Sequence, residues 1–245
     1  MNKDIVLLHG WGFHSGIYTN LAKELSKNFR VTLIDFPGFG KSKPCSDKLN
    51  LEKLVELILE IAPKKSTYLG WSFGGLVASQ LAYTHPDRIN KLINLCSSPK
   101  FITDTDWPGI PADELDKLFA DLSKNHHSTL KRFLLAQILH KDFHKISLLE
   151  INNLLRTNEK TTLPTLINYL NLLKFTDLRQ IITRIACPTH YIFGDLDKLV
   201  PATAAPKITL LQPKVKISII QDCSHLAFIT HSSKIVNLIN EFINE

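Results

Sequence analysis

Apolar and polar residues follow two alternating patterns over the first 98 positions. Short, mainly apolar runs, typical of buried strands in a parallel sheet, occur at Ile5–Leu8, Arg30–Asp35, Ser66–Leu69 and Lys91–Cys96. Between them, apolar residues recur at helical spacing in Ile17–Lys27, Leu51–Ile61 and Leu76–Ala82. Because alternating strands and helices build a parallel sheet with helices on both faces, this part predicts an α/β fold.

The alternation stops at Ser97-Ser98-Pro99 and later resumes. The intervening stretch reads as helices only, with candidates at Ala112–Ser123, Ser128–His140, Ile146–Thr157 and Pro164–Leu173. Strands are again expected at Thr189–Phe193 and Lys216–Ile220, among helices at Leu178–Ile185, Ala204–Leu211 and Ser232–Ile243. We therefore predict one core, residues 1–98 and 176–245, interrupted by a helical lid insertion, residues 99–175.

The strongest chemical pattern follows the strand Ser66–Leu69. Gly70, Ser72 and Gly74 form Gly-x-Ser-x-Gly between that strand and the apolar helix that includes Leu76. A serine in a sharp strand-to-helix turn is a nucleophile elbow. Side chains at Gly70 and Gly74 would collide with the neighbouring strand and helix, so both positions need glycine. Ser72 is the predicted nucleophile, and the chain should also supply a base, an orienting acid and oxyanion donors.

Candidates for the base and the acid follow the last two strands. His225 lies in the loop before the final helix, and Asp195 and Asp197 follow the other strand. Functional groups gather at the carboxyl ends of strands in an open α/β sheet. We favour Asp197, which the turn after Gly194 leaves beside apolar residues, and Asp195 remains the alternative. The order Ser72, Asp197, His225 is the order that accompanies such an elbow.

An oxyanion hole needs two backbone N–H groups aimed at the developing negative charge. One should come from Phe73, directly after the nucleophile. The other should come from Trp11 in His9-Gly10-Trp11-Gly12, whose glycines let the backbone approach a substrate. Trp11 would also give the acyl group an apolar wall, and His9 is expected to have a structural role in the loop.

Two glycine patterns imitate nucleotide sites. Gly38-Phe39-Gly40-Lys41-Ser42 resembles the end of a phosphate loop, but Asp35 stands where its first glycine is required. Gly10-x-Gly12 precedes a helix as in a dinucleotide site, but Ser15 replaces the third glycine. Neither nucleotide reading is favoured.

Composition narrows the remaining classes. The 245 residues are 44% hydrophobic and 21% charged, which suits one sizeable globular core. No apolar run approaches the roughly 20 residues that span a bilayer, and no signal peptide is expected, so we predict a cytosolic protein. The four cysteines, at positions 45, 96, 187 and 223, have neither disulfide-frame nor zinc spacing. The net charge of +6 favours acidic partners.

Together these residues resemble the α/β-hydrolase family. Within it, the chain is similar to the esterases that act on pimeloyl-[acyl-carrier protein] methyl ester in biotin synthesis. The similarity is carried by His9–Gly12, Asp35–Ser42, Gly70–Gln80, Ser97–Pro99 and Asp106–Ile110. Members usually have an extra strand before the first one read here, so we expect a sheet with shortened N-terminal strands.

The resemblance implies residue roles and a substrate. Ser72 would be the nucleophile, Asp197 the orienting acid and His225 the base, with oxyanion donors at Trp11 and Phe73. The family's acyl-binding segment is matched by Phe133, Leu134, Leu135, Ala136 and Gln137. The implied reaction hydrolyses a methyl ester at the end of a carrier-bound pimeloyl chain, without metal or cofactor. We expect a monomer that binds acyl carrier protein, and neither nucleic acid nor membrane.

Other readings remain open. A generic short-chain carboxylesterase or a carbon–carbon-bond hydrolase shares the same triad, and a non-catalytic α/β-hydrolase could serve as a binding module. The lid insertion is acidic between Asp104 and Asp121 and basic between Lys124 and Lys145. We expect this basic segment to dock the acidic carrier protein, through Lys131, Arg132, Lys141 and Lys145.

Overall fold

Six parallel strands form one sheet in the part of the chain that the structure describes. The structure is a computed structural model, and residues 3–44, 49–138 and 161–245 are described. The strands lie in the order β2-β1-β3-β4-β5-β6, and every neighbouring pair is parallel. Their bounds are β1 Lys3–Leu8, β2 Phe29–Ile34, β3 Ser66–Trp71, β4 Ile89–Leu95, β5 Thr189–Gly194 and β6 Lys216–Ile220. The predicted α/β fold with a parallel sheet is confirmed.

Burial follows position in the sheet. All six residues of β3 and of β5 are buried, as the continuous apolar runs predict for strands covered on both faces. The edge strands are less covered: β2 is buried only at Phe29 and Ile34 and β6 only at Ile220, and Leu33 and Ile219 are exposed. The strand that precedes the predicted nucleophile, β3, is therefore buried along its whole length between β1 and β4.

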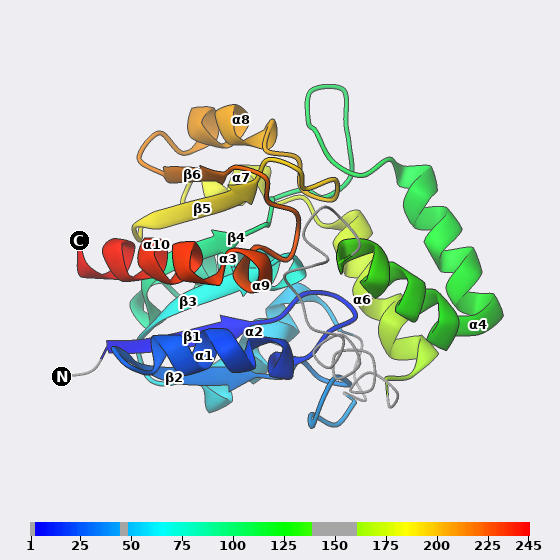
Figure 1. Ribbon diagram of the computed structural model, residues 1–245, viewed down its shortest axis with the longest axis horizontal. Helices are drawn as coiled ribbons and strands as arrows, with labels where there is room; N and C mark the ends of the chain where they lie inside the picture. The colour runs from blue at the N-terminus through cyan, green and yellow to red at the C-terminus, as the bar shows by residue number, and fades with distance from the viewer. Residues whose placement is uncertain (1–2, 45–48, 139–160) are drawn as a thin grey trace.

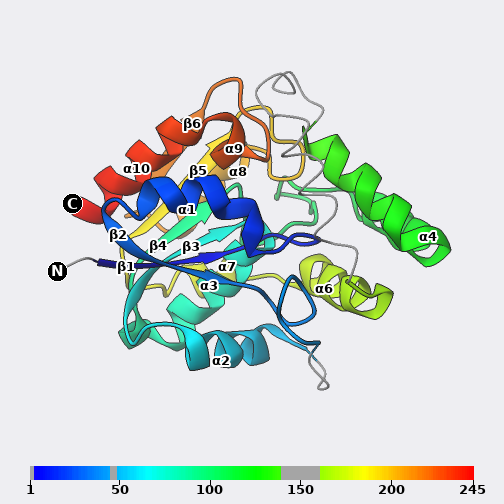
Figure 2. The ribbon, with the colours of Figure 1, turned by 60° about the horizontal axis from the view of Figure 1, so that its bottom comes forward.

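Helices cover both faces of the sheet (Figures 1 and 2). Helices α1 (Thr19–Leu25) and α10 (Ser232–Asn244) lie together on one face, and α2 (Leu51–Ile61) and α3 (Phe73–Thr84) lie on the other. Shorter elements complete the core, namely η1 Ser15–Tyr18, η2 Pro86–Arg88, α7 Arg179–Ile182, α8 Ala204–Leu211 and α9 Ala227–Thr230.

Local sequence explains why these helices form where they do. Helix α2 buries Leu54, Val55 and Ile58 along one stripe, and the Asn50 side chain caps its start by accepting from the Lys53 N–H. Helix α3 is buried from Phe73 to Ala82, because α2 covers the side that faces away from the sheet. None of the described helices is both long enough and apolar enough to cross a bilayer.

The lid insertion contributes α4 (Ala112–Ile138) and α6 (Leu163–Phe175), which lie beyond the carboxyl ends of the strands (Figure 1). The backbone of Asn125 is non-helical, with φ −157° and ψ 92°, and α4 doubles back there as a hairpin. The Asn125 side chain accepts from the Ser128 N–H, so it caps the second half. The break falls between the two predicted helices, 112–123 and 128–140. The predicted helix Ile146–Thr157 lies outside the described residues.

Helix α6 attaches the lid insertion to the core through aromatic packing. The ring of Tyr169 lies edge-on to Phe39 and Phe73, with centroids 5.0 and 5.4 Å away. Its hydroxyl donates to the carbonyl of Pro37 over 3.1 Å. Full burial of a side chain of this size contributes roughly 1.5–3 kcal/mol. The middle of α6 is therefore held against Phe73, the residue that follows Ser72.

Candidate active site

Ser72 stands in a strained turn between β3 and α3. Its backbone has φ 55° and ψ −122°, a region that residues with a side chain rarely occupy. Two contacts hold it, one with the last residue of β4 and one with the chain that follows. The Ser72 N–H donates to the Leu95 carbonyl over 3.0 Å, and the Ser97 hydroxyl donates to the Ser72 carbonyl over 2.7 Å. The neighbouring strand thus supports the strain at the predicted nucleophile.

The two glycines of the motif are required by close backbone approach. A Cβ on Gly70 would lie 2.3 Å from the carbonyl oxygen of Gly74, at the start of α3. A Cβ on Gly74 would lie 2.2 Å from the carbonyl oxygen of Leu8, at the end of β1. The collisions expected from the sequence are confirmed.

His225 and Asp197 face each other at the carboxyl ends of β5 and β6. Nδ1 of His225 lies 2.7 Å from Oδ2 of Asp197, and each residue is only 4% exposed. The other carboxylate oxygen, Oδ1, accepts from the N–H groups of Leu199 and Val200 over 2.9 and 3.0 Å. Because an ionised carboxylate only accepts, Nδ1 carries the proton and Nε2 is left as an acceptor. This tautomer suits a general base.

The alternative aspartate has a different position. Asp195 is exposed, and its Oδ1 accepts from the Cys223 N–H over 3.0 Å. It fixes the loop that carries the histidine and has no contact with the imidazole among the interactions of the described residues. The geometry therefore agrees with the choice of Asp197, whose catalytic role stays a prediction.

The predicted oxyanion donors lie on the two segments next to the elbow. Phe73 is the first residue of α3, and the first N–H groups of a helix have no partner within it. Trp11 lies in the loop after β1. That loop is fixed by His9, whose Nε2 accepts from the Phe36 N–H over 3.0 Å while Nδ1 donates to the Gly10 carbonyl. Burial lowers the pKa of His9 to about 4, so the ring stays neutral in this role.

A small apolar cavity meets Ser72 and His225. Its volume is about 30 Å³, room for about two water molecules. The core contributes aromatic and aliphatic walls, and the lid insertion contributes side chains from α4 and α6. The apolar lining comprises Trp11, Phe13, Trp71 and Leu199 from the core, and Phe101, Ile110, Leu115, Leu118, Phe133, Leu170 and Leu173 from the lid insertion.

Trp11 joins the loop after β1, residues 9–14, which is the predicted oxyanion loop, to the lid insertion. Its indole Nε1–H donates to the carbonyl of Leu166 in α6 over 3.0 Å. Its ring also lies edge-on to Phe133 in α4, with centroids 5.0 Å apart. The predicted apolar wall is thus in contact with α4 and with α6.

The predicted acyl-binding segment is only partly described. Phe133 lines the cavity, whereas Leu135 packs against the wider core and Ala136 is exposed. The side chains of Leu134 and Gln137 lie outside the described residues.

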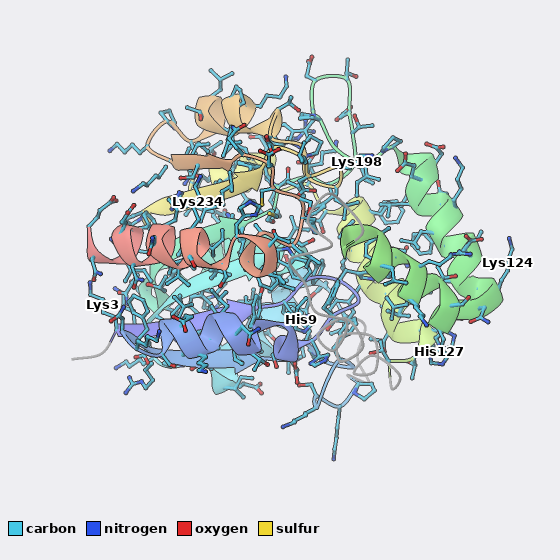
Figure 3. The ribbon with its side chains drawn as sticks, in the orientation of Figure 1. Lys3, His9, Lys124, His127, Lys198 and Lys234 are labelled. Atoms are coloured by element: carbon cyan, nitrogen blue, oxygen red, sulfur yellow. The ribbon has the colours of Figure 1, made fainter. Side chains whose placement is uncertain are left out.

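Of the four predicted docking residues, two are described by the structure. Lys131 and Arg132 are exposed, and Lys141 and Lys145 lie outside the described residues. Arg132 forms an ion pair with Asp121 across the α4 hairpin, with N and O 2.9 Å apart. Lys124, at the outer end of the hairpin in Figure 3, also approaches Asp121, within 3.5 Å. Part of the acidic stretch therefore neutralises part of the basic stretch within the lid insertion.

One group of potential metal ligands includes Asp197 and His225. Donor atoms of Cys96, Asp197 and His225 lie within 4.8 Å of one another, and all three residues are buried. Burial raises the pKa of the Cys96 thiol well above its usual value, and the Asp197 carboxylate adds to the effect. A neutral thiol is a poor metal ligand. The facing atoms of Asp197 and His225 are already bonded to each other, so these donors fit a hydrogen-bonded pair better than a resident metal site.

Three site contacts were not predicted from the sequence. They are the hydrogen bond from Ser97 to Ser72, the bond from Trp11 to Leu166, and one from the Trp71 indole to the His225 carbonyl. The three donor residues all lie in motifs of the sequence analysis, namely Ser97-Ser98-Pro99, His9-Gly10-Trp11-Gly12 and Gly70-Trp71-Ser72. Their partners depend on which chain segments meet in space, so no local pattern indicated them.

Comparisons with known protein families and with solved structures agree on one fold. A family model described as alpha/beta hydrolase fold matches residues 4–232. Solved structures with the same fold include an esterase from Exiguobacterium antarcticum, with a TM-score of 0.88 and 21% identity over 100% of this chain and 92% of that one. An enol-lactonase from Burkholderia xenovorans has a TM-score of 0.87 and 19% identity, over 100% and 92%. A bromoperoxidase from Bacillus anthracis has a TM-score of 0.90 and 19% identity, over 100% and 93%.

Proposed function

The chain belongs to the alpha/beta-hydrolase family, and from that premise we propose that it is a serine carboxylesterase. The observation that carries the proposal is the convergence of Ser72 and His225 on one apolar cavity, with His225 hydrogen-bonded to the buried Asp197. A nucleophile, a base in the right tautomer and an orienting acid are the parts that ester hydrolysis requires. A binding module that had lost catalysis would not need this set.

The mechanism follows from the positions of these groups. Nε2 of His225 accepts the proton of the Ser72 hydroxyl as its oxygen attacks the ester carbonyl, and the imidazolium is stabilised by Asp197. The N–H groups of Phe73 and Trp11 bind the oxygen that becomes negative. The His225 proton passes to the departing alcohol, leaving an acyl ester on Ser72. Water, activated by the same histidine, then releases the carboxylic acid and restores Ser72.

We propose further that the acyl group is the pimeloyl methyl ester of acyl carrier protein. The apolar lining supports an uncharged acyl chain, because a charged one would be buried there without a partner among the described residues. In this substrate the reacting end is a neutral methyl ester, and hydrolysis converts it to a carboxylate. An apolar cavity disfavours that product, which favours its release.

The carrier protein would approach over the lid insertion. Lys131 and Arg132 are exposed on α4, directly before the predicted acyl-binding segment, residues 133–137. The first residue of that segment, Phe133, lines the cavity. Basic side chains at such a rim attract an acidic partner and raise the rate of association. The ion pair of Arg132 with Asp121 weakens this effect without removing it, since exposed pairs contribute only about 0–1 kcal/mol.

A second candidate, a generic short-chain carboxylesterase, is favoured by the volume of the cavity. About 30 Å³ does not hold an acyl chain of several carbons. The longer substrate therefore requires that the lid helices separate, whereas an acetyl ester requires little movement.

Steady-state kinetics distinguishes the two candidates. For the proposed enzyme, kcat/KM for pimeloyl-[acyl-carrier protein] methyl ester should exceed that for dimethyl pimelate and for p-nitrophenyl acetate by about 10² or more. Equal values for carrier-bound and free methyl esters would favour the generic esterase. Absence of hydrolysis with every ester, by protein that is folded, would remove the esterase proposal. Growth of a biotin-requiring strain that lacks this esterase step tests the same assignment in cells.

The docking proposal has its own test. Lys131→Glu with Arg132→Glu should raise the KM for the carrier-bound ester severalfold and leave p-nitrophenyl acetate hydrolysis unchanged. The matched control is Lys214→Glu with Lys234→Glu, an equal charge change at exposed lysines remote from the lid insertion (Lys234 is labelled in Figure 3). An equal effect of both double variants would show that only net charge matters. Equal losses on both substrates would show that Lys131 and Arg132 hold the lid insertion together.

A further inference from the structure

The residue before the predicted nucleophile contacts the predicted base. The indole Nε1–H of Trp71 donates to the backbone carbonyl of His225 over 2.9 Å, and the bond is buried. The two residues are 154 positions apart in the chain. We propose that Trp71 is a positioning residue that fixes His225 relative to Ser72; this inference rests on the proposed esterase function.

The hydrogen bond from Trp71 restrains the backbone of His225, whereas Asp197 contacts only its ring. Asp197 holds Nδ1 of the ring, while Trp71 holds the carbonyl of the same residue. If only the backbone were held, the imidazole could turn about its side-chain bonds. If only Nδ1 were held, the backbone could shift and carry the ring with it. With both held, the position of Nε2 is fixed. Because Trp71 is the last residue of β3 and adjoins Ser72, the position is fixed relative to the nucleophile itself.

Ring contacts reinforce this hydrogen bond. The Trp71 ring is tilted against the His225 ring, with centroids 5.3 Å apart, and lies edge-on to Phe228 at 5.1 Å. Phe13, from the oxyanion loop, lies edge-on to it at 4.9 Å. Trp71 is 1% exposed, so the indole cannot move aside without displacing these neighbours. Tight packing of this kind transmits position from one segment to the next.

The oxyanion loop is shaped to admit the same indole. A Cβ on Gly10 would lie 2.9 Å from two ring carbons of Trp71. Gly10 therefore leaves the space that the ring occupies. One side chain touches the loops that carry the nucleophile, the base and one oxyanion donor, which is the property required of a positioning residue.

Trp71→Phe tests the inference because phenylalanine retains an aromatic ring and loses the N–H donor. With p-nitrophenyl acetate, we expect kcat to fall about 10- to 100-fold, the range that small misplacements of catalytic groups produce, with KM changed by less than about twofold. Trp107→Phe is the matched control. Its indole Nε1–H also donates to a backbone carbonyl, that of Lys100 over 3.0 Å, but Trp107 is not part of the cavity lining. It should keep kcat within about twofold of the parent.

Two readouts separate positioning from general loss of structure. Titration with a p-nitrophenyl phosphonate counts competent serines, and Trp71→Phe should leave this count near one per chain while slowing the rate per site as much as kcat. A damaged fold would lower the count and leave the rate per site unchanged. In a double-mutant cycle, Trp71→Phe should cost less than about threefold in the Asp197→Asn background, since both residues act through His225.

The outcomes also distinguish this inference from the proposed function. If the parent protein hydrolyses no ester, or if Ser72→Ala retains full activity, the esterase proposal fails. If the parent is active and Trp71→Phe keeps kcat within twofold, the positioning inference alone is wrong. Fully additive losses in the double-mutant cycle would also overturn it.

Discussion

Replacing Asp197 with asparagine is expected to shift the proton of His225 to the wrong nitrogen. Oδ1 of Asp197 accepts from the N–H groups of Leu199 and Val200, and Oδ2 faces Nδ1 of His225. An asparagine would keep its oxygen on the two backbone N–H groups and turn its NH₂ group toward Nδ1. Nδ1 must then accept, so the proton resides on Nε2, which can no longer take the proton of Ser72.

The size of the loss follows from the cost of the opposite amide orientation. Flipping the asparagine would restore the correct tautomer but would leave the buried N–H of Val200 and the partly buried N–H of Leu199 facing an NH₂ group. Each unsatisfied donor costs about 1–3 kcal/mol, so the flip costs about 2–6 kcal/mol. At about 1.4 kcal/mol per tenfold, the flipped form is populated at a few per cent or less. We therefore expect kcat to fall by at least about 30-fold and by as much as about 10⁴-fold.

The assay compares two aspartates that are two residues apart. Asp195→Asn is the control, since an asparagine oxygen can still accept from the Cys223 N–H while its NH₂ group faces solvent. Its kcat with p-nitrophenyl acetate should remain within about threefold of the parent, and thermal unfolding should show both variants folded. Equal losses in the two variants, or more than a tenth of parental kcat in Asp197→Asn, would refute the reasoning.

Three further predictions address the nucleophile, the elbow and acid stability. Ser72→Ala and His225→Ala should each lower kcat by about 10⁴-fold or more, and the double variant should lose little more, because the residues act as a unit; additive losses would contradict this. Gly74→Ala should lower the free energy of unfolding in urea by about 1–3 kcal/mol, because the added Cβ would meet the Leu8 carbonyl oxygen. The control, Gly16→Ala, should cost less, because its Cβ would meet only the movable His14 ring. Burial lowers the pKa of His190 to about 4, so the unfolded chain binds more protons between about pH 6.5 and 4 and stability falls as the pH falls through this window. His190→Gln should remove about 2–3 kcal/mol of that pH dependence, and an unchanged dependence would show that His190 does not cause it.

Several features could be predicted from the sequence because they depend on neighbours along the chain. The apolar runs of β1 and β3 indicated buried parallel strands, and helical spacing indicated α2 and α10. Gly-x-Ser-x-Gly indicated the turn at Ser72, since only glycine tolerates the backbone approach at positions 70 and 74. The break at Asn125 was anticipated by the gap between two helical patterns.

Chain order also limited the candidates for base and acid. Residues that follow parallel strands meet at one edge of the sheet, so His225 and an aspartate after β5 could be placed near Ser72. The choice between Asp195 and Asp197 was not fixed by that argument. It depends on the turn after Gly194, which gives Asp197 two backbone donors and directs its second oxygen to His225, while Asp195 is bonded to Cys223.

Contacts between distant segments were decided only by the tertiary structure. The indole of Trp71 reaches a carbonyl 154 residues away, and that of Trp11 reaches one 155 residues away. The cavity of about 30 Å³ is set by how closely α4 and α6 approach the loops of the core. Local patterns arise from steric limits and hydrogen bonds within a few residues, so a short stretch of sequence is enough to indicate them. Which backbone carbonyl faces an indole, and how much space remains over Ser72, depends on the packing of the whole chain.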